Sequence, residues 1–207
     1  MTTKERILLE SKAWLVEKLS LNNNYFHSLR KTPKPNILWI GSSDNLISIR
    51  EVTNTEPGEL IVHRNIAAQV RTGDINLMAT LEDAIDAGIE YIIVCGSSNC
   101  KGIREVVQGI EDQVYMREWL DDLLELYNEH VSELEPLPQV EQEKRLCELS
   151  IKEQLLKLSE LDIVQQAWER KSSPILLGWY FDLETGTIKE LFSMTARQSI
   201  KQVASVI

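Results

Sequence analysis

Three short polar loops hold most of the side chains in this sequence that could do chemistry. Each loop follows an apolar run, and the loops contain Ser42 and Asp44, then His63, then Ser97 and Cys100. The Asp44 carboxylate can act as a base, the Cys100 thiol as a nucleophile or ligand, and the hydroxyls as hydrogen-bond donors. Two interpretations of these groups are open. One is a polar pocket that binds a small anion or supports metal-free chemistry. The other, which we favour because no base–nucleophile pair is present, is a loop cluster filled by water and small side chains, with no chemical role.

Histidine, the most versatile catalytic side chain, is scarce and scattered. His27, His63 and His130 form no pair at a spacing of three or four residues with each other or with a cysteine, so no helical metal motif is visible. Only His63 lies on a candidate loop, and a Ser-His-Asp arrangement needs a histidine beside a serine. We therefore expect neither a helical metal site nor a serine-hydrolase triad.

The three cysteines, Cys95, Cys100 and Cys147, cannot all pair in disulfides. Nothing else in the sequence indicates secretion, so we expect reduced thiols in a cytoplasmic protein. Cys95 lies in an apolar run and is expected in the core. Cys100 lies near a predicted helix start, where the helix dipole lowers the pKa of a thiol, but the interpretation that we favour is an inert, partly buried thiol. A Cys95–Cys100 disulfide has little support in a reducing compartment.

Length and charge limit the class of protein. The 207 residues, 43% of them hydrophobic and 26% charged, suffice for a folded domain with a sizeable core. Lysine and arginine total 22 against 32 acidic residues, and the net charge of −10 argues against binding to a nucleic-acid backbone. No apolar run reaches the roughly 18 residues that span a bilayer, and the first residues lack a signal-peptide core. We expect no nucleic-acid partner and no membrane association.

Apolar runs that alternate with helical patterns must position the three loops. Short buried strands are predicted at 36–41, 60–64, 91–95, 175–181 and 188–192. Helices are predicted at 3–19, 75–87 and 102–107, and 119–170 is mostly helical. This alternation indicates an α/β fold with a mostly parallel β-sheet flanked by helices. Sites in such sheets form beyond the carboxyl ends of the strands, which is where the polar loops lie.

The three loops and the strands before them resemble the β-class carbonic anhydrases. The resemblance runs over about 25–191 and is carried by 38–44, 56–67, 92–100, 147–154, 163–170 and 178–182. It implies an α/β domain over 25–207 and an N-terminal helical arm over 1–24. In the family a similar helix packs on a partner subunit, and here Trp14, Leu15 and Leu19 lie on one helix face. The resemblance therefore implies a homodimer or a dimer of dimers.

The sequence departs from the family at the positions that hold its metal. The resembled enzymes bind zinc through Cys-x-Asp in the first loop and His-x-x-Cys in the third, and an arginine two residues after the Asp pairs with it. Ser42, Ser97 and Leu46 replace the cysteine, the histidine and the arginine, so only Asp44 and Cys100 match. A serine hydroxyl is a poor zinc ligand at neutral pH because it must first lose a proton. We expect no zinc at these former metal-site positions.

Without zinc and its arginine, a buried Asp44 carboxylate needs new partners. The candidates are Ser42, Ser43, Ser97 and Arg64, and Lys101 could bring a positive charge nearby.

A second, noncatalytic bicarbonate pocket occurs in some members of the resembled family. Trp39 and Arg64 match its tryptophan and arginine, which makes them candidate anion-binding residues. Its tyrosine position is Phe181 here, and Tyr180 is expected on the opposite face because side chains alternate along a strand. The alternative, which we favour, has Trp39 in the core and Arg64 paired with a local carboxylate.

The resemblance and its departures together predict a carbonic-anhydrase-like pseudoenzyme without zinc and without carbon dioxide hydration. Its role would be regulatory or structural, as a partner of an active paralogue or as a sensor of bicarbonate. The alternative is an enzyme with a rebuilt metal-free or altered-metal site, acting on carbon dioxide, bicarbonate or a related small molecule. In that case Asp44 is the candidate base, Cys100 the nucleophile or ligand, and Ser42 and Ser97 the donors.

Overall fold

A mixed β-sheet organises the protein. The structure is a computed structural model that describes residues 1–31, 34–46, 48–171, 173–196 and 198–202. The six-stranded sheet has the order β2-β1-β3-β4-β5-β6, and its first four strands are parallel while the last two pairings are antiparallel. The strands are β1 (Ile37–Ser42), β2 (Leu60–Asn65), β3 (Tyr91–Ser97), β4 (Ile175–Asp182), β5 (Thr187–Thr195) and β6 (Gln198–Gln202).

The predicted mostly parallel sheet is confirmed, and each predicted strand is present. β6 was not predicted, because its five residues contain one apolar side chain and so carry no alternating pattern. Strand register brings the polar loops to one edge: Ser42 pairs with Asn65, and Gly41 pairs with Cys95. Parallel strands thus deliver all three loops to their shared carboxyl end, as the site requires.

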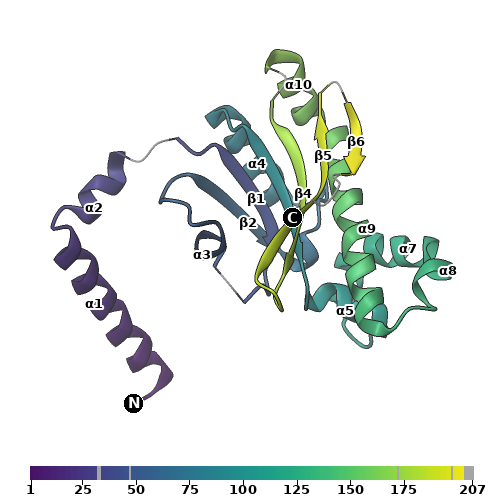
Figure 1. Ribbon diagram of the computed structural model, residues 1–207, viewed down its shortest axis with the longest axis horizontal. Coiled ribbons are helices and arrows are strands. Elements are labelled where there is room, and N and C mark those ends of the chain that lie inside the picture. Colours follow the sequence, from purple (N-terminus) through teal and green to yellow (C-terminus); the bar gives the residue numbers. More distant parts are fainter. Residues whose placement is uncertain (32–33, 47, 172, 197, 203–207) are drawn as a thin grey trace.

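Most of the long helices cover one face of the sheet. α9 (Gln139–Glu160) crosses β3 and β4, and α4 (Ile75–Ala87), α5 (Lys101–Gln108), α7 (Asp121–Glu129) and α10 (Asp162–Lys171) pack around it (Figure 1). The shorter helices are α2 (Tyr25–Ser28), α3 (Ile49–Thr53), α6 (Val114–Trp119) and α8 (Val131–Leu134), and 3-10 turns span Leu29–Lys31 and Ile66–Ala68. Asp74 caps the start of α4 through the amides of Asn76 and Leu77.

Alternation along the strands divides the core into two clusters. The helix-covered face buries Leu38, Ile40, Ile92, Leu176 and Tyr180, among others. The opposite face buries a smaller set: Trp39, Ile49, Ile93, Cys95, Leu177 and Phe181. α9 approaches the sheet closely because β3 and β4 have glycines beneath it. A Cβ at Gly96 would lie 2.5 Å from Cys147 Sγ, and one at Gly178 would lie 2.7 Å from Ile151 Cγ2.

The N-terminal segment forms an arm that extends away from the sheet (Figure 1). α1 (Thr3–Leu21) begins at a capping box made by Thr2 and Glu5, and none of its residues is buried. Trp14 lies edge-on to Phe26, with ring centroids 5.6 Å apart, which ties α2 to α1. Its large apolar side chains, including Leu8 and Val16, are mostly exposed. The 1–24 boundary and the packing of this arm on a partner stay predictions.

No described helix combines the length and the apolar character needed to cross a bilayer.

Candidate functional site

Ser42 is the centre of a compact hydrogen-bond cluster at the carboxyl end of β1. Its side chain is buried and its hydroxyl donates to Asp44 Oδ1. The same oxygen accepts the backbone N–H of Ala67 at 3.3 Å and lies 3.5 Å from Cys100 Sγ. The hydroxyl therefore uses its donor and its acceptor capacity on protein groups.

Asp44 has a different environment from the one expected from the sequence. The expectation of a buried carboxylate is wrong for this chain, because the loop after β1 turns outward and leaves Asp44 exposed. Its partners are the Ser42 hydroxyl and the backbone N–H of Lys101, which donates to Oδ2. Of the candidate partners, Ser42 is confirmed. The N–H of Lys101 lies at the start of α5, so the negative charge of the Asp44 carboxylate lies at the positive end of the helix dipole, which is a favourable arrangement.

Cys100 immediately precedes α5 and is 5% exposed. Burial, followed by the nearby Asp44 charge, raises the pKa of its thiol, and hydrogen bonds with Ser42 and with the backbone of Ile103 and Gly102 offset this only in part. The thiol is therefore protonated near neutral pH, which counts against the reactive-thiolate interpretation. Cys95 is also buried, and burial raises its pKa to about 12. All three cysteines are free, so the Cys95–Cys100 disulfide is not formed.

Ser97 lies beside the Ser42 cluster but makes no hydrogen bond to its described residues. It is 6% exposed and lines a surface cleft with Cys100 and Tyr180. The structure thus joins Ser42, Asp44 and Cys100 by direct contacts, and it places Ser97 beside Cys100 without a hydrogen bond to the cluster.

The donor set does not fit zinc. At the four positions the structure presents two hydroxyls, one exposed carboxylate and one thiol with a raised pKa. Across the described residues, no group of three or more His, Cys, Asp or Glu side chains is arranged to hold a metal ion. A zinc ligand must offer a deprotonated donor. Zinc readily displaces the proton of a cysteine thiol such as that of Cys100, but the hydroxyls of Ser42 and Ser97 are far weaker acids and are poor ligands.

Arg64 holds the first loop through its backbone. Its guanidinium donates to the Ser42 carbonyl at 2.9 Å and to the Asn45 carbonyl at 2.7 Å. Among the described residues, Arg64 therefore pairs with no carboxylate, neither that of Asp44 nor another local one, and binds carbonyl oxygens of the first loop instead.

Trp39 packs in the core of the second sheet face. It is buried and lies edge-on to Trp179, with ring centroids 5.8 Å apart. Phe181 belongs to the same cluster, whereas Tyr180 packs on the helix-covered face. The expected orientation of Tyr180 is confirmed, and the candidate anion pocket has no tyrosine hydroxyl on the Trp39 face at this strand position.

Sequence reasoning missed the residues that shape the second loop. Asn65 Oδ1 accepts the N–H of Gln69 at 2.7 Å, and Asn65 Nδ2 donates to the Gln69 carbonyl at 2.7 Å. From α9, Gln154 Oε1 accepts the N–H of Val70 at 2.7 Å. Ala67 and Ala68, which lie between these contacts, have φ values of 60° and 53°. This turn directs the Ala67 N–H toward Ser42. The only sequence signal for the turn was Asn65, which lies in the segment 56–67 that resembles the family.

His63 is expected to make the fold less stable in mild acid. It is buried on β2, 3.7 Å from Asp74, and burial lowers its pKa despite that carboxylate. The unfolded chain then takes up a proton near pH 6.5 while the folded chain resists it, so stability is lost as pH falls through 6.5 toward the lower folded value. His63→Asn should flatten this part of a plot of melting temperature against pH. His27→Asn, which removes an exposed imidazole, is the control, and an equal flattening there would contradict the assignment.

Comparison with known proteins gives one consistent match. The family model described as carbonic anhydrase matches residues 37–188. A carbonic anhydrase of Emericella nidulans is 31% identical over 191 residues, which cover 91% of this chain and 83% of that protein. A tetrameric β-carbonic anhydrase of Sordaria macrospora superposes with a TM-score of 0.86 at 29% identity, covering 91% of this chain and 96% of that one. The β-carbonic anhydrase CafA of Aspergillus fumigatus gives 0.84 at 26% identity, covering 96% and 93%.

Proposed function

Because this chain belongs to the β-class carbonic anhydrase family, we propose that it is a member that neither holds zinc nor hydrates carbon dioxide. The observation that supports this proposal is the Ser42 hydroxyl, which stands at a ligand position and is hydrogen-bonded to Asp44 and Ala67. Zinc at this place would have to break those bonds and would gain a neutral hydroxyl in return. The exchange of a thiolate and an imidazole for two hydroxyls removes both strong donors.

The chemistry of the family depends on the metal, which lowers the pKa of bound water so that hydroxide forms near neutral pH. Among the described residues of the Ser42 cluster, none offers a substitute for the metal as a source of hydroxide. Asp44 is exposed and already accepts two hydrogen bonds, and the Cys100 thiol has a raised pKa. The rebuilt-site alternative needs Asp44 as a base and Cys100 as a nucleophile or ligand, and neither environment favours that role.

Metal analysis and stopped-flow carbon dioxide hydration on one sample test the proposal. We expect protein purified with zinc present to contain far less than one ion per chain and to leave the hydration rate at its uncatalysed value. About one zinc per chain with hydration would overturn the proposal. Hydration without stoichiometric metal, lost in a folded Asp44→Asn variant, would establish the rebuilt-site alternative instead.

The proposed role is regulatory or structural, within a homodimer or a dimer of dimers. The Sordaria macrospora relative is described as tetrameric, and the exposed apolar residues of α1 suit burial against another subunit. An active paralogue as partner, bicarbonate as ligand and a cytoplasmic location belong to the same proposal. The free thiols agree with a reducing compartment.

Leu15→Asp is expected to weaken this assembly. Leu15 is 41% exposed on α1 of the isolated chain, and a carboxylate in a buried apolar interface would lack a partner. We expect the dissociation constant of the assembly to rise roughly tenfold or more, as judged by sedimentation. Lys12→Ala, which changes an exposed polar residue of the same helix, should leave it near the original value. An unchanged dissociation constant in Leu15→Asp would remove α1 from the interface.

A further inference from the structure

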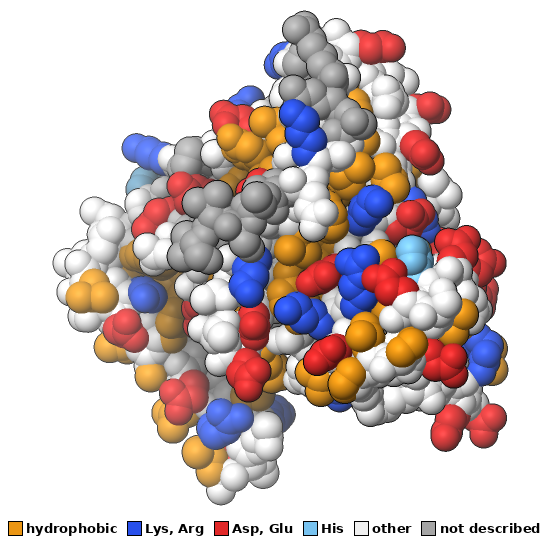
Figure 2. All heavy atoms as spheres, turned by 45° about the vertical axis from the view of Figure 1, so that its right-hand side comes forward, with side chains coloured by type: hydrophobic (Ala, Val, Ile, Leu, Met, Phe, Trp, Pro, Cys, Tyr) orange, Lys and Arg blue, Asp and Glu red, His pale blue; other side chains and the backbone are white. Residues whose placement is uncertain are grey.

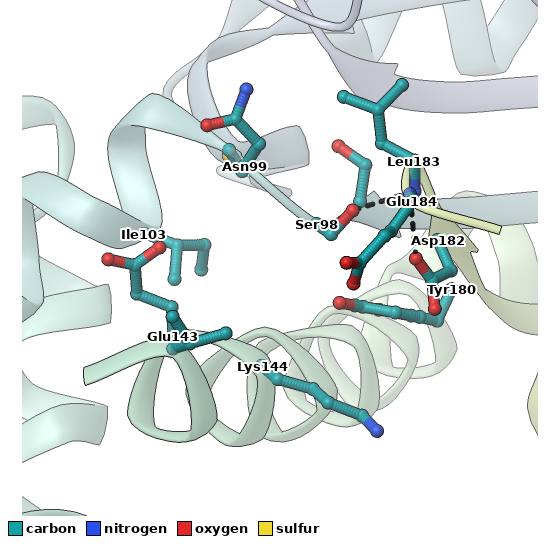
Figure 3. Close-up of a pocket in the computed structure, with 12 residues that line it drawn as sticks. Ser98, Asn99, Ile103, Glu143, Lys144, Tyr180, Asp182, Leu183 and Glu184 are labelled. Carbon is teal, nitrogen blue, oxygen red and sulfur yellow. Dashed lines mark hydrogen bonds between the residues drawn. The ribbon is translucent and has the colours of Figure 1, made fainter. Parts of the chain in front are cut away.

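A cleft of about 460 Å³ lies beside Cys100, between the start of α5, the first turns of α9 and the turn after β4. This volume falls in the range of pockets that hold small organic ligands. The cleft belongs to the helix-rich side of the molecule, where acidic and basic side chains alternate over the surface (Figure 2). Figure 3 shows Glu143 from α9 on one wall and Tyr180, Asp182 and Glu184 on the other.

The buried part of the cleft is polar. Ser97 is 6% exposed and Tyr180 is 4% exposed, and both line it. No hydrogen bond joins the Ser97 hydroxyl to another described residue. Among the described residues no fully enclosed side-chain oxygen or nitrogen lacks a partner, so the unbonded Ser97 oxygen keeps some exposure where the residue lines the cleft. The Ser97 hydroxyl is therefore available to a molecule bound in the cleft.

The wall formed by the turn after β4 is acidic. Asp182 Oδ1 accepts the N–H groups of Glu184 and Thr185 at 3.0 and 3.4 Å. The Glu184 carboxylate forms no ion pair with a described residue, and in Figure 3 it points toward the same part of the cleft as the Tyr180 hydroxyl. Both carboxylates therefore keep oxygen atoms for a ligand.

The opposite wall carries one carboxylate, Glu143, and one ammonium group, Lys144. Glu143 accepts a hydrogen bond from Gln139 at 2.8 Å and faces Arg104 at 3.8 Å. Lys144 extends away from the oxygens of Tyr180 and Glu184 in Figure 3. Ile103 and Leu183 provide apolar surface. The free acceptors of the cleft thus gather on its acidic wall and at Ser97, next to a hydrocarbon surface.

We propose that this cleft binds a small aliphatic ammonium ion, with the charged end at Asp182 and Glu184 and the hydrocarbon part over Ile103. An ammonium group has three donors, and the Ser97 hydroxyl supplies a further acceptor. The proposal rests on the proposed function in one respect, because the Ser97 hydroxyl must not be engaged by a metal, and the chelator in the following test separates the two.

The test is a titration of the full chain with n-butylammonium chloride in the presence of a chelator, followed by protein NMR. n-Butanol and sodium butyrate, of similar size, are titrated in parallel. We expect saturable shifts of cleft residues with butylammonium and much weaker responses to the other two. Glu184→Gln and Ser97→Ala should each weaken binding roughly threefold to tenfold. Glu169→Gln, an exposed carboxylate on α10, should not.

Three results would overturn the proposal. The first is an absence of saturable butylammonium binding in the folded protein. The second is equal or tighter binding of butanol or butyrate, which would assign the cleft to a neutral or anionic ligand. The third is an equal loss of affinity in Glu169→Gln, or no loss in both cleft variants, which would place the bound ammonium elsewhere. Circular dichroism of each variant confirms that its fold is retained.

Discussion

Changing Ser42 to Cys and Ser97 to His together is expected to raise bound zinc from a trace to about one ion per chain. The double variant would present a thiolate, an imidazole, Asp44 and Cys100 at the four former ligand positions. Structural zinc sites with four such ligands gain about 10 kcal/mol or more from the metal. The expected change in affinity is therefore several orders of magnitude, measured by competition with a chromophoric chelator and by metal analysis after dialysis.

Because Leu46 is unchanged in the double variant, we expect this variant to bind zinc without hydrating carbon dioxide. In the resembled enzymes an arginine at this position pairs with the aspartate and frees the fourth coordination position. Asp44 has no such arginine, so it should complete a closed site of the structural type. Adding Leu46→Arg to the double variant is expected to bring carbon dioxide hydration above the uncatalysed rate.

A matched control moves the same two residue types by one position. Ser43→Cys with Ser98→His adds a thiol and an imidazole to the same loops, but Ser43 is exposed and Ser98 holds the N–H of Leu183 at 2.8 Å. This control should bind no more zinc than the original chain. Zinc bound as tightly by the original chain as by the double variant would sink the explanation based on ligand type.

Leu155→Ala should cause the largest loss of stability among the changes discussed here. Leu155 is fully buried in α9, and its Cδ1 lies 3.0 Å from where a Cβ at Gly178 would be. Truncation of a buried leucine costs about 2–5 kcal/mol because a cavity remains. For a chain of this size that corresponds to a melting temperature lower by roughly 4–20 °C. Thermal and denaturant unfolding followed by circular dichroism measure it.

Val140→Ala is the control for this prediction on the same helix. Val140 is 79% exposed, so its truncation should change the free energy of unfolding by about 0.5 kcal/mol or less. Equal losses in the two variants would show that α9 does not pack against the sheet as described.

The sequence predicts the sheet well because buried parallel strands have a strong local signature. Ile37–Ser42 and Tyr91–Ser97 are apolar runs that end at glycine and serine, and their loops must meet at one edge once the strands are parallel. The resemblance supplies the family and the positions of the missing ligands.

The contacts within the site depend on residues far apart in the sequence, which no local pattern contains. Ser42 accepts a hydrogen bond from Ala67, and the turn that presents Ala67 is held from α9 by Gln154. The exposure of Asp44 and the cleft at Ser97 likewise depend on how loops and helices pack. Residue types alone could not show that the Ser97 hydroxyl makes no hydrogen bond to the Ser42 cluster.

The left-handed turn at Ala67 and Ala68 links α9 to the Ser42 cluster. Each alanine in this conformation costs about 1–2 kcal/mol relative to the right-handed conformation, so other contacts must offset this cost. The side chains of Asn65 and Gln154 stabilise the turn, because they accept hydrogen bonds from the N–H groups of Gln69 and Val70. A shift of α9 that releases Val70 would let the turn relax toward right-handed geometry and withdraw the Ala67 N–H from Ser42. The hydrogen bonds of Ser42 therefore depend on the position of α9 as well as on the strands that carry the site.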